Sequence, residues 1–98
     1  MIPDKIKIGG IVYTVRQDKN ETLEQAGNDA CIRYLPQEIW MRDYLGPDYK
    51  TQCLCHEITH GIFDAIGRSD LRADEVLVSA FGNMLHQVLK DNKLIFGD

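Results

Sequence analysis

The pattern of apolar and polar residues changes its period near the middle of the chain. Before residue 46, short runs rich in β-branched and aromatic residues alternate with clusters of glycine, proline and polar residues, a pattern typical of strands. From about residue 48 the apolar residues recur every three or four positions, which predicts helices. Strands followed by helices predict an α+β fold.

The first half predicts three or four short antiparallel strands arranged as hairpins. Two strand-like runs flank Gly9-Gly10, and glycine tolerates the positive φ of a two-residue hairpin turn. Two more runs, residues 30–34 and 38–42, flank Pro36-Gln37, and the latter is expected as an edge strand. Trp40 is expected in the core. The polar segment 17–29 is expected to be a loop or a short helical turn.

The second half predicts two helices on which the strands pack. The first runs over residues 48–66 and ends at Gly67. Ser69 or Asp70 is expected to cap the second helix, which continues to about Asp91. Because the connection is short, we expect the two helices to be antiparallel neighbours.

Length and composition fit one small cytoplasmic domain covering residues 1–98. The chain is 44% hydrophobic and 27% charged, as in an ordinary globular protein. The net charge of −4 argues against nucleic acid as a partner, although a local basic patch can hide in an acidic total. No apolar run approaches the roughly 20 residues of a membrane span, and the N-terminus does not resemble a signal peptide.

The segment His56-Glu57-Ile58-Thr59-His60 is an H-E-x-x-H motif. Residues four apart share one face of a helix, so both imidazoles can bind one Zn²⁺. Glu57 lies one step around the helix, where its carboxylate can take a proton from an attacking water as general base. The motif also arises by chance on polar helix faces, and that reading predicts no bound metal.

A catalytic zinc requires a third protein ligand and one open position. The position where a metzincin would supply a third histidine holds Ile66. Glu75, near the start of the second predicted helix, shares a stripe with Gly82, whose missing side chain would ease a close helix approach. Glu75 is therefore the favoured third ligand, with Asp74 and Asp70 as competitors.

Other residues near the motif have weaker assignments. Cys53 lies one turn before His56, but its spacing does not match zinc fingers, so we expect it to line a pocket. The odd count of three cysteines argues against disulfides. Asp64 either orients an imidazole or faces solvent. Candidate donors to an oxyanion are Tyr34, Tyr44 and Tyr49.

The run H-E-I-T-H-G-I-F-D-A-I-G and the following D-E-V-L-V-S-A-F-G-N-M-L-H-Q-V-L resemble the ImmA/IrrE-like metallopeptidases of bacteria and phages, in a minimal form. The resemblance covers about residues 53–91. It implies a zincin-like zinc metalloendopeptidase with one Zn²⁺ per chain, bound by His56, His60 and Glu75. The implied substrate is a cytosolic protein, such as a phage or bacterial regulator. The alternative is a non-catalytic, zinc-stabilised protein-interaction module.

Overall fold

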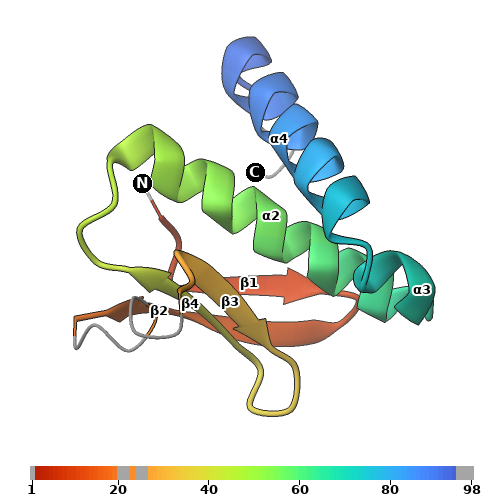
Figure 1. The fold of residues 1–98 in the computed structure, drawn as a ribbon. Helices are drawn as coiled ribbons and strands as arrows, with labels where there is room; N and C mark the ends of the chain where they lie inside the picture. Colours follow the sequence, from red (N-terminus) through yellow and green to blue (C-terminus); the bar gives the residue numbers. More distant parts are fainter. Residues whose placement is uncertain (1, 20–22, 24–26, 95–98) are drawn as a thin grey trace.

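The computed structural model describes residues 2–19, 23 and 27–94, and its fold is α+β, as the sequence predicts. Four strands precede three helices in this part of the chain (Figure 1). The strands are β1 (Lys5–Ile8), β2 (Ile11–Asp18), β3 (Ala30–Arg33) and β4 (Glu38–Arg42). The helices are α2 (Pro47–Ala65), α3 (Ser69–Arg72) and α4 (Glu75–Asn92). Much of the predicted loop 17–29, namely residues 20–22 and 24–26, lies outside the described residues.

The four strands form one sheet in the order β1-β2-β4-β3. The two hairpins are antiparallel, as expected, and Gly9 and Gly10 adopt φ of 59° and 86° at the first turn. However, β2 and β4 pair in parallel, so the sheet is mixed and not wholly antiparallel. The segment 38–42 is therefore a central strand, and the expectation of an edge there is wrong. The edge strand on that side is β3.

The core lies between this sheet and α2. Alternate residues of the central strands point toward the helix and are buried, with Ile39 and Met41 fully so. Burial of each large apolar side chain contributes about 1.5–3 kcal/mol. Since Ile39 and Met41 point inward, Trp40 points to the opposite face, where it is half-buried. The prediction of Trp40 as a core residue is therefore wrong, because adjacent residues of a strand point to opposite faces of the sheet.

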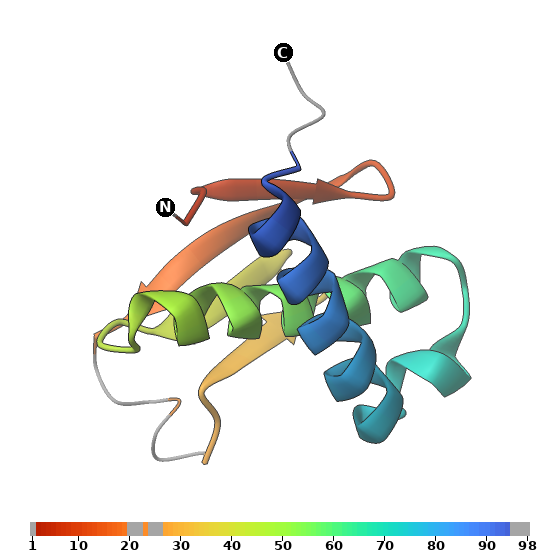
Figure 2. The ribbon, with the colours of Figure 1, turned by 90° about the horizontal axis from the view of Figure 1, so that it is seen from above.

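Helix α2 lies between two layers, with the sheet on one side and α4 on the other (Figure 1). Figure 2 shows that α4 crosses α2 and is not antiparallel to it, which corrects the sequence expectation. At the crossing, Gly82 lies directly against the backbone of α2. A Cβ placed on Gly82 would be 2.9 Å from His56 Cα, closer than real side chains allow. The close approach expected at Gly82 is therefore confirmed.

The connection between the two long helices contains the short helix α3. The expectation that Ser69 or Asp70 caps the second long helix is wrong, because both are the first residues of α3, whereas α4 begins only at Glu75. Asp74 has an extended backbone, and its Oδ1 accepts a hydrogen bond of 3.0 Å from the Leu77 backbone N–H. This N-cap fixes where α4 starts.

In the described part of the chain, no helix combines the length and apolarity that a membrane span requires.

We expect Gly82→Ala to lower the free energy of unfolding by about 1–2 kcal/mol, because the clash with α2 outweighs the gain in helix propensity. Gly46→Ala is the matched control, since a Cβ there meets no atom within 4 Å and φ is already −57°. Urea unfolding of both variants measures the difference. Unchanged or increased stability of Gly82→Ala would show that the two helices are not in close contact.

Candidate metal centre

Helix α2 brings the three polar residues of the motif together. His56, Glu57 and His60 each present a ligand atom, and these atoms lie within 4.8 Å of one another. The imidazole rings meet edge to face with centroids 5.0 Å apart. This follows from the four-residue spacing of the histidines, which places both on one side of the helix. The structure therefore contains a His-Glu-His group that can hold a metal ion.

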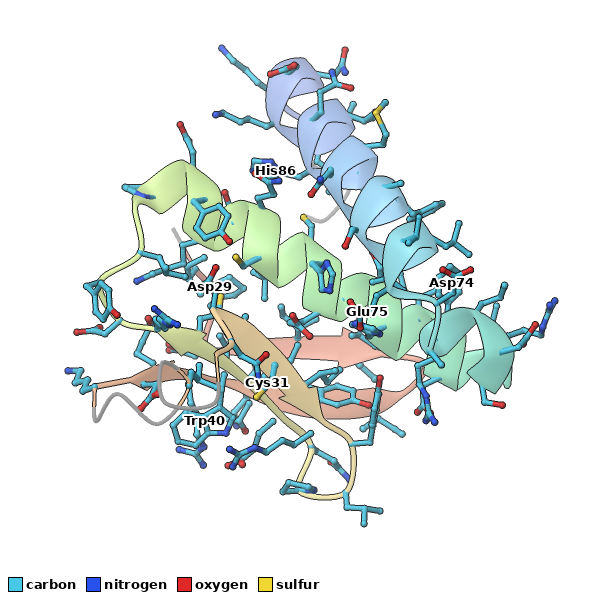
Figure 3. All side chains as sticks on the ribbon, viewed as in Figure 1. Asp29, Cys31, Trp40, Asp74, Glu75 and His86 are labelled. Carbon is cyan, nitrogen blue, oxygen red and sulfur yellow. The ribbon has the colours of Figure 1, made fainter. Side chains whose placement is uncertain are left out.

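Glu75 lies directly against both imidazoles (Figure 3). Its Oε1 is 2.9 Å from His60 Nε2, and its Oε2 is 3.3 Å from His56 Nε2. As the first residue of α4, Glu75 takes its position from the Asp74 cap and from the crossing at Gly82.

The two competing carboxylates have other partners. Asp74 caps α4, and Asp70 forms a two-bond ion pair with Arg68 at 2.7 and 2.9 Å. This pair lowers the pKa of Asp70 to about 2. Of the three acidic residues considered in this region, only Glu75 contacts the histidines in the described structure.

The spacing of these donor atoms suits a small divalent cation. Metal–ligand bonds of about 2.0–2.1 Å in a tetrahedral site separate neighbouring donor atoms by about 3.3 Å. The nitrogen–oxygen distances of 3.3 and 2.9 Å lie close to this value. Two imidazole nitrogens and one carboxylate form a donor set typical of zinc. The Glu57 carboxylate also belongs to the group and is a further possible ligand.

The tautomer of His60 and the lowered pKa of His56 both suit metal binding. His60 Nδ1 lies 2.8 Å from the Arg72 backbone carbonyl, and a carbonyl only accepts, so Nδ1 carries the proton. The Nε2 atom then faces Glu75. Burial and the neighbouring His60 lower the pKa of His56, which keeps its imidazole neutral near pH 7. Neutral imidazoles are the form that binds cations.

Arg72 is a positioning residue that the sequence did not reveal. Besides its carbonyl on His60, its Nη1 donates to Asp64 Oδ1 at 2.7 Å, and its guanidinium lies over the Tyr34 ring at 5.0 Å. Asp64 thus contacts Arg72 in the described structure and can act on His60 only through it. A backbone carbonyl leaves no trace in the sequence, so no sequence signal identifies this contact.

Glu57 is 6% exposed, and it is the most deeply buried carboxylate of the site. Burial, reinforced by the nearby Glu75 charge, raises the pKa of Glu57 to about 8. Without a cation the side chain is therefore mostly protonated at neutral pH, and a nearby positive ion would favour its charged form. A carboxyl group that changes protonation near neutrality is suited to proton transfer.

Two adjoining cavities open onto this group, and His56 and Glu57 line both. The larger, about 400 Å³, is bordered by the edge strand β3 and also contains Tyr34 and Glu75. Burial raises the pKa of Tyr34 to about 12, so its hydroxyl stays protonated and can donate. The other two candidate tyrosines have hydrogen-bond partners: Tyr49, which lines the second cavity, donates to Asp29, and Tyr44 accepts from Arg42.

The cysteines do not join the His-Glu-His group. Cys53 is buried and lines the second cavity, of about 350 Å³, in agreement with the expectation that it lines a pocket. Burial raises the pKa of the Cys53 thiol, which disfavours the thiolate form that binds metals. Cys55 is buried, and its backbone carbonyl lies near Gly82, whereas Cys31 is in β3.

Comparisons of this chain with protein-family models, with curated proteins and with solved structures return no match. The resemblance to ImmA/IrrE-like metallopeptidases therefore rests on the chain's own residues, and its firmest part is the His-Glu-His group on α2.

We expect the purified protein to bind about one zinc per chain, and His60→Ala to lose it, because that change removes an anchored imidazole. His86→Ala is the matched control, since His86 bonds Thr51 and lies outside the His-Glu-His group. Elemental analysis after dialysis, with circular dichroism to confirm folding, gives the stoichiometry. Equal zinc content in the two variants would rule out this site.

Proposed function

We propose that this protein is a zinc-dependent peptidase. The observation that supports this most strongly is the convergence of His56, His60 and the Glu75 carboxylate next to the buried Glu57. Three ligands of this kind leave one coordination position for a reactant, as catalytic zinc sites do. When bound, the ion would supply Lewis-acid chemistry, polarising a carbonyl and making water a stronger acid.

Glu57 performs the proton transfers in the proposed reaction. Its carboxylate removes a proton from the attacking water, whose oxygen forms a bond to the peptide carbonyl carbon. When the carbon–nitrogen bond breaks, Glu57 passes that proton to the leaving amine, so one group acts first as base and then as acid. The raised pKa of Glu57 is compatible with both roles.

Tyr34 is the proposed donor to the negative charge that develops on the carbonyl oxygen. It borders the same cavity as Glu57 and keeps its proton at neutral pH. The Arg72 guanidinium over its ring holds the phenol in place and adds positive charge nearby. Oriented donors of this kind stabilise a developing oxyanion.

The proposed substrate is an extended segment of a protein. Strand β3 is the sheet edge that borders the larger cavity, through Ala30, Cys31 and Ile32. An edge strand offers unpaired backbone groups to a peptide, which can bind by adding a strand to the sheet. A folded substrate would have to expose a flexible segment to reach the cavity beside β3.

A second candidate function is a zinc-stabilised interaction module without catalysis. The placement of the ligand residues on two helices favours this second function, because His56 and His60 belong to α2 and Glu75 belongs to α4. A cation held between them would stabilise the helix pair whether or not any bond is cleaved. This candidate predicts that zinc removal unfolds the protein and that no substrate is cleaved.

We expect Glu57→Gln to lose hydrolysis by at least about 100-fold while binding zinc as the unchanged protein does, because the amide cannot accept the proton. Glu38→Gln, on the opposite face of the sheet, is the matched control. Mass spectrometry of a denatured protein mixture after incubation detects new termini. Cleavage that persists in Glu57→Gln, or that is absent from the zinc-loaded unchanged protein, contradicts the proposal.

A further inference from the structure

In the described structure, α3 and α4 leave the sheet face opposite α2 uncovered (Figure 1). Several basic residues of the strands belong to this face. Strand alternation and register direct five basic side chains to this side, and one of them, Arg42, pairs with Asp29. The basic face is defined by the other four cations together with Glu38 and Trp40: Lys5, Lys7, Arg16 and Arg33.

The charge on this face is opposite to that of the molecule. Its four cations and one carboxylate give a net charge of +3, in a chain whose total is −4. Lys5, Lys7 and Arg33 are exposed, and no ion pair joins them to an acidic group among the described residues. Two acidic side chains point to this side by alternation: Asp18 is buried, and Glu38 accepts from Arg16 Nε. Neither cancels the charge of Lys5, Lys7 and Arg33.

Planar groups gather at the centre of the same face. Trp40 lies on the central strand β4, and the guanidinium carbons of Arg16 and Arg33 are 5.9 and 5.3 Å from its ring centroid. Glu38 accepts from Trp40 Nε1 at 3.1 Å as well as from Arg16, so one carboxylate orients both groups. Figure 3 shows Trp40 on the side of the sheet away from the helices.

We propose that this face binds single-stranded nucleic acid. Cations arranged across an open sheet suit a phosphate backbone, and an indole flanked by guanidinium groups offers flat surfaces on which bases stack. Four-stranded sheets with an aromatic residue on a central strand provide a platform of this kind. An acidic peptide would use the cations but would gain little from the planar groups.

This face also explains how an acidic protein can bind a polyanion. A negative net charge disfavours the binding of nucleic acid when charges are evenly distributed. Here the cations are concentrated on one side of the molecule. Because the metal centre lies across the sheet, on the side of α2, nucleic acid and a polypeptide can be bound at the same time. The proposal does not depend on catalysis.

The test is fluorescence anisotropy of the zinc-loaded protein with labelled 12-nucleotide oligothymidylate and oligouridylate. We expect binding to both, with an affinity that falls as salt increases, by a logarithmic slope of about −2 to −3 for three or four phosphate contacts. Tighter binding of oligothymidylate would indicate a preference for DNA, and tighter binding of oligouridylate a preference for RNA. Absence of binding to both at low salt overturns the proposal.

Two variants test the face, and each is checked for folding by its zinc content. Arg33→Gln and Trp40→Leu should each weaken binding by about tenfold, through loss of a phosphate contact and of stacking respectively. Arg68→Gln, an exposed arginine between α2 and α3, should leave it unchanged. The proposal would be contradicted if Arg68→Gln lost as much affinity as the other variants, or if Arg33→Gln lost none. It would also be contradicted if polyglutamate displaced the labelled oligonucleotide as effectively as unlabelled oligonucleotide does.

Discussion

The candidate metal centre depends on how closely α4 approaches α2. At the crossing, Gly82 has no side chain, and the distance from its missing Cβ to His56 Cα would be only 2.9 Å. This contact holds the start of α4 over the end of α2 on which His60 lies. Glu75 then reaches both imidazoles from the first position of α4, and the Asp74 cap sets that position. Any change that separates the helices removes the carboxylate from the histidines.

Burial of polar groups beside this crossing has an energetic cost that the fold offsets with hydrogen bonds. Thr59 is fully buried and donates to the Cys55 carbonyl at 2.8 Å, and His60 bonds the Arg72 carbonyl. Among the described residues, no fully buried side-chain nitrogen or oxygen lacks a partner. Glu57 is the group whose burial is least offset, as its raised pKa shows. Buried groups with strongly shifted pKa values cluster at functional sites.

Features set by local spacing were predictable, and features set by distant pairing were not. The four-residue interval between His56 and His60 fixes their common face wherever the helix packs, and Gly9-Gly10 fixes the first hairpin. Counting ligands pointed to Glu75, which does contact both histidines although the expected antiparallel packing is wrong; its role as a ligand stays a prediction. The parallel pairing of β2 with β4 depends on contacts across 24 residues, as between Thr14 and Glu38, and local patterns do not encode it. The contact between the Arg72 carbonyl and His60 could not be predicted for a different reason, because every residue has a backbone carbonyl.

Both proposed functions use opposite sides of the same thin sheet. The inward side chains of β2 and β4 build most of the core that supports α2, while outward side chains of all four strands form the basic face. Trp40 shows how strict this division is, because its neighbours Ile39 and Met41 are fully buried on the other side. The small fold can therefore present two surfaces of different chemistry without a second domain.

The central claim is that two imidazoles and the Glu75 carboxylate bind one cation while the cysteines remain outside the site. X-ray absorption at the zinc edge tests it most directly, because sulfur and lighter ligands scatter differently and at different distances. We expect nitrogen and oxygen ligands at about 2.0–2.1 Å, with imidazole scattering and no sulfur. A zinc–sulfur distance of about 2.3 Å would place Cys53 or another thiol on the metal and rule out this ligand set.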